Sequence, residues 1–458
     1  MKLLKRREFL LGLGSLGLLG FLNWDYVYGA LSEVNFPGGE KKNEEVELIS
    51  CDYVLENGLI VDGTGRTGYP GRVGIKEDRI VALGDFNYQE GAQVIPAQGL
   101  VITPGFIDLH THTESYWLAG GTGEMVLKQG VTTQIGGNCG TSVPSIENYF
   151  QSLPPTPINL GLFVGYKNLR NQAGAVPEDL IDEAGLKIME ENLARGLMEG
   201  AFGLSVGLEY YPQAKGTKEE MIALCRVLRE KGGFYSTHIR NENDSVIPAL
   251  REAITIGLTA GVPVQYSHVK ASRQENWGKM SQLLALMEDA ASIGLDITGD
   301  VYPYTFSSLD VDNNNITESM NEEDMLQALQ HPLIMVGSDS GLSKEGVAIH
   351  PRAYGNYPRV LSLYTGAGKS LSLEQAVHKM TGMPAKRLKL KDRGTIAVDM
   401  KADLAVFNLD GVQDLATRDN PNQLSMGMKY VFVNGRKVLE QGKLTGEKGG
   451  GPLRYQHS

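Results

Sequence analysis

The chain has 458 residues, which is long enough for one large domain, a smaller one and a sizeable buried core. Its 43 basic and 54 acidic residues give a formal net charge of -11, and no polybasic run lies beyond the extreme N-terminus, which argues against nucleic acid as a partner. Three scattered cysteines, Cys51, Cys139 and Cys225, are too few for a disulfide framework, so each thiol is interpreted singly.

Residues 1–30 have the composition of an export signal. The basic stretch Lys5-Arg6-Arg7 precedes Glu8-Phe9-Leu10 and a glycine-rich apolar run to Leu22, an order that resembles a twin-arginine signal. The apolar run of about 14 residues is shorter than the roughly 20 that a spanning helix needs. We expect a periplasmic or extracellular protein, either cleaved near Gly29-Ala30 or tethered to the membrane by an uncleaved segment. The alternative is a chance basic start before a buried helix.

Two flanks rich in predicted strands, residues 46–103 and 386–445, surround the central part of the chain. Each contains an Asn-Gly pair, Asn57-Gly58 and Asn434-Gly435, of the kind that closes tight hairpins. We expect the flanks to pair into one small β-sandwich domain formed from both chain ends. The glycine-rich tail at residues 449–451 is expected to be loose.

Residues 104–385 alternate short β-type runs with amphipathic helical stretches that usually end at glycine, as βαβ units do. The last five runs are centred near residues 204, 236, 266, 299 and 335, a nearly constant spacing. Eight runs at this period predict an α/β fold of the (β/α)8 TIM barrel type. The runs are Gly105-Phe106-Ile107, Thr132-Thr133-Gln134, Leu160-Gly161-Leu162, Gly203-Leu204-Ser205, Tyr235-Ser236-Thr237, Gln265-Tyr266-Ser267, Thr298-Gly299-Asp300 and Ile334-Met335-Val336.

His110 and His112 end the first predicted barrel strand. Residues two apart on a strand point to the same side, so both imidazoles can reach one metal ion. Histidine pairs also occur by chance on protein surfaces, but barrel enzymes place their chemistry at the C-terminal ends of the strands. The position therefore favours a metal site.

Further ligands follow other predicted strands, namely Cys139, His238 and His268. If the barrel closes, these side chains converge, and a thiolate with imidazoles is typical of zinc rather than magnesium or calcium. Asp339 follows the eighth strand, where a carboxylate could bind metal and move a proton.

His378 lies beside an apolar stripe and is expected to be solvated. The other histidines do not end predicted strands: His331, His350 and His457.

Taken together, these segments resemble the N-acyl-D-amino-acid deacylases, or D-aminoacylases, of the amidohydrolase superfamily. The resemblance extends from Asp52 to Leu453, and the order and spacing of the motifs make it specific. The motifs are Pro104 through His112, Asn138-Cys139-Gly140, Thr237-His238-Ile239-Arg240-Asn241-Glu242, Ser267-His268-Val269-Lys270, Gly337-Ser338-Asp339, His350-Pro351-Arg352, Asp392-Arg393-Gly394 and Lys401-Ala402-Asp403-Leu404-Ala405.

The resemblance implies a metal centre with two positions. A tightly bound zinc ion would be held by Cys139, His238 and His268. A second, weaker or variably filled position would be formed by His110, His112 and Asp339, so one or two zinc ions are open alternatives.

The resemblance also implies how a small substrate is held, an N-acyl-D-amino acid or a dipeptide with a D-residue. Lys270 and Arg352 match positions that bind the substrate carboxylate. Tyr210, Tyr302 and Ser308 match pocket positions, with ordinary packing or turn roles as the alternative. The D configuration follows from the resemblance alone, and the oligomeric state is not indicated.

One departure from the family lies after Tyr302-Pro303-Tyr304. Relatives usually carry a long insertion there that forms a cap near the active site. In this chain the segment between the seventh and eighth strands is short and consists of residues Ser308 to Val336. A shortened cap would open the pocket, and we expect it to alter the usual side-chain preference and to admit larger substrates.

Three functional hypotheses follow. The first is zinc-dependent amide hydrolysis, in which the metal lowers the pKa of water and polarises the carbonyl while Asp339 moves the proton. The second is a cyclic-amide hydrolase of the hydantoinase or dihydropyrimidinase kind, which normally has a bridging lysine carbamate after the fourth strand; the run Gly203 to Gly207 contains no lysine. The third is a non-catalytic zinc-binding protein, which would be expected to have lost Asp339.

Overall fold

The computed structural model describes residues 48–174, 180–308 and 316–456. The export signal expected within residues 1–30 therefore lies outside the described residues. Leu48–Ser458 form one compact unit. Within the described ranges, no helix is both long enough and apolar enough to span a membrane.

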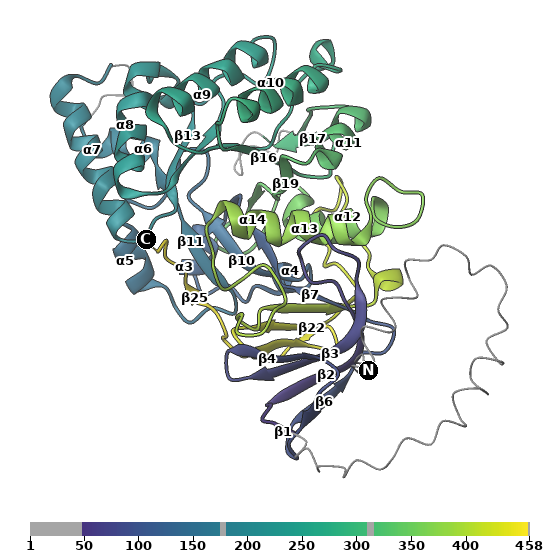
Figure 1. Ribbon diagram of the computed structural model, residues 1–458. Coiled ribbons are helices and arrows are strands. Elements are labelled where there is room, and N and C mark those ends of the chain that lie inside the picture. Colours follow the sequence, from purple (N-terminus) through teal and green to yellow (C-terminus); the bar gives the residue numbers. More distant parts are fainter. Residues whose placement is uncertain (1–47, 175–179, 309–315, 457–458) are drawn as a thin grey trace, which may run out of the picture. The chain divides into compact units, whose positions relative to one another are not determined.

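Parallel strands at the centre of this unit lie where the sequence predicts them, with helices on their outer side (Figure 1). Each strand is hydrogen-bonded to the next, β11 continues into β12, and the short strands β20 and β9 pair to link the last position to the first. An α/β fold is thus confirmed. The strands are β8 (Phe106–Asp108), β9 (Thr111–His112), β10 (Val131–Gly136), β11 (Asn159–Leu162), β12 (Val164–Gly165), β13 (Gly203–Gly207), β14 (Phe234–His238), β15 (Val264–Tyr266), β16 (Ile297–Val301), β19 (Ile334–Val336) and β20 (Ser340–Gly341).

The helices follow the amphipathic stretches of the sequence, as α8 (Lys218–Lys231) illustrates. Its N-cap is Thr217, whose hydroxyl accepts a hydrogen bond from the backbone N–H of Glu220 and satisfies a donor that the first turn leaves free. Met221, Leu224, Cys225 and Leu228 form its buried stripe, so Cys225 belongs to the core. The other helices are α3 (Glu114–Leu118), α4 (Glu124–Leu127), α5 (Ile146–Ser152), α6 (Tyr166–Gln172), α7 (Glu183–Met198), α9 (Val246–Ala260), α10 (Met280–Ser292), α11 (Glu322–Gln330), α12 (Arg352–Leu363), α13 (Leu373–Met380) and α14 (Gly382–Arg387).

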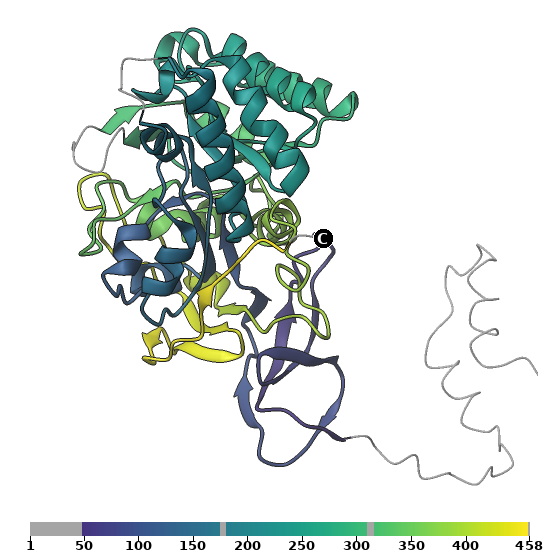
Figure 2. The same cartoon turned by 90° about the vertical axis from the view of Figure 1, so that its left-hand side faces the viewer.

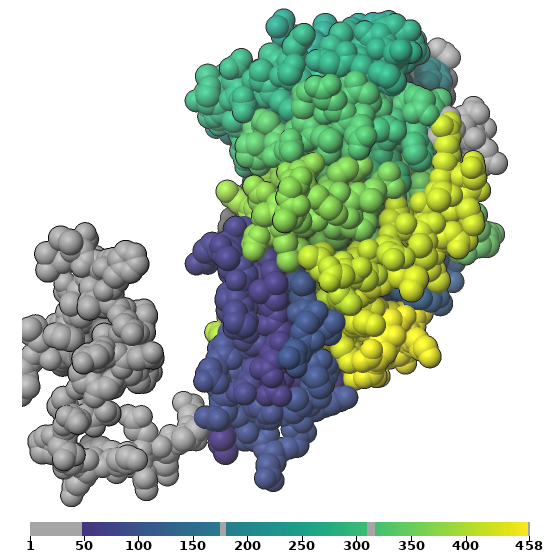
Figure 3. Space-filling view, turned by 90° about the vertical axis from the view of Figure 1, so that its right-hand side faces the viewer, coloured from purple at the N-terminus to yellow at the C-terminus, as the bar shows by residue number. Residues whose placement is uncertain are grey.

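The two strand-rich flanks pair into one nine-stranded sheet. The antiparallel pairing of β7 with β21 joins them, for example at Ile102 opposite Val406. Figures 2 and 3 show the purple N-terminal flank beside yellow C-terminal segments. One buried apolar cluster contains residues from both flanks, so each flank completes the core of the other. The strands are β2 (Tyr53–Ile60), β3 (Tyr69–Lys76), β4 (Arg79–Gly84), β6 (Gln93–Pro96), β7 (Val101–Pro104), β21 (Leu404–Phe407), β22 (Met428–Val433), β23 (Arg436–Glu440) and β24 (Lys443–Leu444).

The C-terminal tail is ordered, so the expectation of a loose tail is wrong. Its strand β25 (Gly451–Pro452) pairs with the start of β11, and Tyr455 is buried with its ring centroid 6.0 Å from that of Phe202. The long-range pairing satisfies backbone groups that glycines alone would leave to solvent. The tail therefore packs near the amino ends of the central strands.

Candidate metal centre

All six predicted metal ligands lie at the carboxyl ends of the central parallel strands. His238 is the last residue of β14, whereas Cys139, His268 and Asp339 lie just beyond β10, β15 and β19. His110 lies in the break between β8 and β9, and His112 ends β9. The predicted continuous strand through both histidines is thus interrupted, but their rings still face one region, with centroids 5.6 Å apart.

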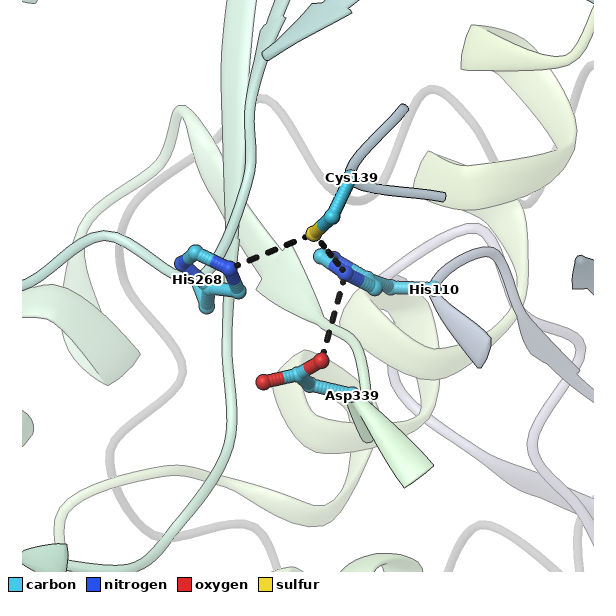
Figure 4. Close-up of side chains that lie close together, drawn as sticks. All are labelled: His110, Cys139, His268 and Asp339. Carbon is cyan, nitrogen blue, oxygen red and sulfur yellow. Dashed lines mark hydrogen bonds and ion pairs between the residues drawn. The ribbon is translucent and has the colours of Figure 1, made fainter. Parts of the chain in front are cut away.

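Four of these side chains form the tightest group (Figure 4). The Cys139 Sγ atom lies 3.4 Å from His110 Nε2 and 3.6 Å from His268 Nε2. An Asp339 Oδ1 atom lies 3.4 Å from the same His110 nitrogen. The four ligand atoms lie within 4.8 Å of one another, and all four residues are buried.

The other two histidines adjoin this group. His112 Nε2 lies 3.2 Å from Asp339 Oδ1, and His238 Nδ1 lies 3.0 Å from His268 Nε2. The structure therefore brings all six predicted ligands together. It does not separate them into the two sets that the family resemblance implies, because the tightest group joins Cys139 and His268 to His110 and Asp339 and leaves out His238.

The donor set fits a divalent metal ion. Zinc bonds to nitrogen and sulfur of about 2.0–2.3 Å correspond to separations of about 3.3–3.8 Å between ligands at tetrahedral corners. The separations of 3.4 and 3.6 Å around Cys139 Sγ lie in this range. One thiolate, imidazoles and a carboxylate are also ligands that suit zinc and other transition metals better than magnesium or calcium.

Three carboxylates outside the ligand set face three of the four histidines. In each of these three, a carboxylate lies beside the ring nitrogen that points away from the centre, as is usual for metal-bound histidines. His110 Nδ1 lies 3.0 Å from Asp300 Oδ1, and His238 Nε2 lies 3.0 Å from Glu209 Oε2. His268 Nδ1 lies 2.9 Å from Glu242 Oε1. This arrangement leaves the nitrogen on the other side of each ring available to a metal ion.

Sequence analysis did not identify these three carboxylates. Two had a signal, because Glu242 lies four residues after His238 in a motif and Asp300 lies near the end of the seventh predicted strand. Glu209 lies in the loop after β13 and had no signal of its own.

Local backbone geometry also marks the site. Cys139, His268 and Asp339 have φ angles of 50°, 38° and 51°, in the left-handed region that few residues other than glycine adopt. Such conformations cost of order 1–3 kcal/mol each and persist where the surrounding structure imposes them. Next to Cys139, Gly140 is required because a Cβ atom there would collide with the Gln213 side chain, whose amide donates to the Cys139 carbonyl at 3.0 Å.

Electrostatics favour the thiolate form of Cys139. Burial alone would raise the pKa of the thiol, but His110 and hydrogen bonds from His110, His112 and His238 lower the pKa well below its usual value. Burial likewise opposes the charged form of His112, yet Asp339 and Cys139 raise its pKa to about 9. Thiolate is the form that binds metal, and a bound cation would displace the histidine protons.

The two predicted carboxylate-binding residues lie close to the ring of Tyr302. Arg352 lies over the Tyr302 ring at 4.7 Å and Lys270 at 5.7 Å, and all three are buried. Arg352 Nη2 contacts Asp339 Oδ2 at 2.9 Å and Ser308 Oγ at 3.2 Å, whereas its Nε and Nη1 atoms and the Tyr302 hydroxyl have no hydrogen-bond partner within the described chain. Unsatisfied buried donors of this kind suit a bound anion.

His350 supports Arg352. Its Nδ1 accepts a hydrogen bond from the Arg352 backbone N–H at 3.1 Å, and its Nε2 donates to the Phe306 carbonyl at 2.9 Å. Burial and the neighbouring Arg352 charge hold the pKa of His350 well below its usual value. The ring is thus neutral and links strand β17 (Phe306–Ser308), which pairs with β18 (Ile316–Glu318), to the start of α12.

Two pockets flank the ligands. One of about 450 Å³, called here the Lys167 pocket, is lined by His112, Cys139, Thr141, Lys167, Tyr210, Tyr211, Gln213, Ser308, Asp339, Gly341, Ile349, His350 and Arg352. The other, of about 380 Å³ and called here the Lys270 pocket, is lined by Glu209, Tyr210, His238, Glu242, Asn243, His268, Lys270, Ser272, Arg273, Ser307, Ser308, Thr317, Glu318 and Asp339. Both share Tyr210 and Ser308, which the sequence placed in the substrate pocket, and the Tyr210 ring lies 4.4 Å from that of His238.

Other histidines lie away from the centre. His378 is half-buried and hydrogen-bonded to the Gly63 carbonyl at 2.7 Å, so the expectation that it is solvated is wrong. His331 pairs with Glu288 at 3.1 Å. His457 lies outside the described residues.

Comparison with known proteins matches this geometry to characterised enzymes. Residues 101–438 match the family described as the Amidohydrolase family. N-acyl-D-glutamate deacylase of Alcaligenes xylosoxydans xylosoxydans is 33% identical over 460 residues, which cover 85% of this chain and 94% of the relative. Since the alignment is longer than the part of this chain that it covers, the relative has segments without a counterpart here, as a shortened insertion would produce.

Two solved structures of deacylases are similar to this chain in fold and sequence. The N-acyl-D-glutamate deacylase of Bordetella bronchiseptica, complexed with zinc and a phosphonate that mimics the tetrahedral intermediate, has a TM-score of 0.83 and 30% identity over 88% of this chain and all of that chain. A D-aminoacylase described with a binuclear metal centre, one-metal activation and second-metal attenuation has a TM-score of 0.82 and 30% identity over 89% of this chain and 100% of that chain. The resemblance inferred from the motifs is therefore confirmed.

Proposed function

The chain belongs to the amidohydrolase family and is a hydrolase of linear amide bonds, and we propose that it deacylates N-acyl-D-amino acids with zinc. Dipeptides with a C-terminal D-residue are included in the proposed substrate class. The products are a carboxylate and a free D-amino acid. The observation that carries the proposal is the burial of Asp339 between the predicted metal ligands and Arg352, because it places a proton acceptor beside a carboxylate anchor.

Cys139, His238 and His268 would hold the tight zinc ion, and His110, His112 and Asp339 would complete a second, weaker position. A bound zinc ion supplies a water of lowered pKa and polarises the amide carbonyl. Asp300, Glu209 and Glu242 keep the histidine rings oriented.

Asp339 would accept the proton of the attacking water and deliver it to the departing nitrogen. Amide hydrolysis requires that delivery because an amide anion is too basic to leave. Arg352, Lys270 and Tyr302 would orient the substrate carboxylate through charge-assisted hydrogen bonds, and Ser308 would position the Arg352 fork. Tyr210 would line the substrate pocket beside His238.

The alternatives are weaker at this site. A cyclic-amide hydrolase of the hydantoinase kind would need a lysine after β13, whereas the following loop provides Glu209, which contacts His238. A non-catalytic zinc protein would have no use for a buried Asp339–Arg352 pair.

We also propose the complete domain plan expected from the sequence, with a (β/α)8 barrel at residues 104–385 and a small β-sandwich domain at residues 46–103 and 386–445. The circular strand pairing supports the barrel, and the shared apolar cluster of the two flanks supports the sandwich.

Export by a twin-arginine signal is part of the proposal and rests on Lys5-Arg6-Arg7 and the apolar run that follows. Substitution of both arginines by lysine should retain the enzyme in the cytoplasm of its host. Unchanged export of that variant would contradict this part.

The test of the proposed activity is a comparison of enantiomers. Zinc-loaded protein should hydrolyse N-acetyl-D-amino acids or L,D-dipeptides and leave the matching N-acetyl-L-amino acids intact, with release of free amine as the measurement. Zinc-loaded protein that turns over no D substrate, or hydrolyses hydantoins instead, would overturn the proposal.

A further inference from the structure

Lys167 is a charged residue of the Lys167 pocket to which the proposed reaction gives no role. It lies in the first turn of α6, is half-buried, and lines the pocket together with the metal ligands Cys139 and Asp339. Its backbone N–H donates to the Gly140 carbonyl at 2.9 Å, so its position is tied directly to the loop that carries Cys139. Neighbouring Tyr166 is buried and donates to Glu220 at 2.6 Å, which fixes the start of the helix.

The Lys167 ammonium group forms no ion pair with any carboxylate of the described chain. Asp339 is the one acidic residue among the described residues of this pocket, and it already contacts Arg352, His110 and His112. A cation without a partner inside a concave site raises the local concentration of anions. This positive charge is notable in a chain of net charge -11.

The lining of the Lys270 pocket carries more negative than positive side chains. Its described lining contains four carboxylates, those of Glu209, Glu242, Glu318 and Asp339, against the cations Lys270 and Arg273. An additional anionic group would therefore be repelled there and attracted on the Lys167 side of the centre. The two pockets on either side of the predicted metal ligands thus differ in charge.

We propose that Lys167 binds a second anionic group of the substrate, in addition to the carboxylate that Arg352 and Lys270 orient. This inference rests on the proposed deacylase function and names its substrate class as dianionic. The second carboxylate could be carried by the acyl group or by the amino-acid side chain, and both present the same chemistry to the ammonium group. Lys167 is accordingly a specificity-determining residue.

The test compares each acid with its uncharged carboxamide on the full zinc-loaded enzyme. One pair is N-acetyl-D-glutamate and N-acetyl-D-glutamine; the other is N-succinyl-D-alanine and its terminal amide. We expect the acid to be preferred by about tenfold in kcat/KM in one pair, which identifies the side that carries the charge, and the preference to weaken with salt.

Lys167→Met should remove this preference by raising KM for the acid, and Lys167→Arg should retain most of it. Lys187→Met, which removes the same charge from an exposed position on α7, should change neither the preference for the acid nor its KM. Equal kcat/KM values for acid and amide in both pairs would overturn the inference while the deacylase function stands. A preference for the acid that survives in Lys167→Met would overturn it in the same way. Absence of turnover with every N-acyl-D-amino acid would instead overturn the proposed function.

Discussion

Arg352 and Asp339 form a buried ion pair, with Nη2 of the arginine 2.9 Å from Oδ2 of the aspartate. Burial alone would raise the pKa of Asp339, but Arg352, His268 and His110 hold it well below its usual value. The second carboxylate oxygen faces His110 and His112 at 3.4 and 3.2 Å. One carboxylate therefore connects the group that would anchor the substrate with the groups that would hold the metal.

Replacement of Asp339 by Asn should reduce kcat by about 10²–10⁴, because an amide cannot accept the proton that general base catalysis transfers. Zinc should remain bound through Cys139, His238 and His268. Turnover measured together with zinc content by mass spectrometry tests this. Activity that persists in the zinc-loaded variant would remove Asp339 from the catalytic role.

Zinc affinity should fall with decreasing pH. The pKa values of His112 and His238 are raised to about 9 and about 10, so binding must displace their protons at neutral pH. Each displaced proton makes the affinity fall about tenfold per pH unit. Competition with a chromophoric chelator at several pH values measures the slope, and Cys139→Ser should weaken binding at every pH. An affinity independent of pH would contradict this ligand assignment.

Stability at alkaline pH should depend on Lys379 of α13. Burial lowers the pKa of this lysine from its ordinary 10.5 to about 8, and its Nζ donates to the His331 and Ile334 carbonyls before and within β19. Below pH 8 the ammonium group is protonated in both states, and between about 8 and 10.5 the unfolded chain binds more protons. The free energy of unfolding should therefore rise with pH in that window, by at most about 1.4 kcal/mol per unit.

Lys379→Met is the control for this rise, since methionine has no titrating group. Urea denaturation of both proteins from neutral to alkaline pH gives the difference. Curves that stay parallel would show that Lys379 has an ordinary pKa in the folded protein.

The sequence predicted the central strands well because their signal is local. A short apolar run before an amphipathic helix, as at Ile334-Met335-Val336, needs no distant partner to be recognised. The convergence of the predicted metal ligands could also be predicted, because these residues follow such strands and because parallel strands bring their carboxyl ends together. The convergence of His110 with Cys139, Asp339 and His268 follows from that rule.

Features that depend on distant contacts could not be predicted in this way. Asp300 of β16 contacts His110, which follows β8 and lies 190 residues earlier in the chain, and Gly451 pairs with Asn159 of β11. Glu209 reaches His238 from a loop whose path no periodicity defines. The break between β8 and β9 likewise depends on local packing at the end of the strand, which the two-residue spacing of the histidines does not reveal.

Substitution of Glu242 should affect both metal binding and substrate binding, and comparison with substitution of Asp300 separates the two effects. Its Oε1 lies 2.9 Å from both His268 Nδ1 and Lys270 Nζ, so one buried carboxylate contacts a predicted metal ligand and a cation proposed to bind the substrate carboxylate. Asp300 also contacts a predicted metal ligand, His110, but it has no contact with Lys270 among the described interactions. Glu242→Gln should therefore weaken zinc binding and raise KM, whereas Asp300→Asn should weaken zinc binding alone.

The magnitude expected for zinc is about 10- to 100-fold in each variant, as for other residues that orient metal-bound histidines. Excess zinc separates the two effects, because it should restore kcat in both variants while KM of Glu242→Gln stays elevated. Zinc titration and steady-state kinetics on the same preparations measure both. If zinc returned KM of Glu242→Gln to the wild-type value, the carboxylate would act on the metal alone and Lys270 would be positioned without it.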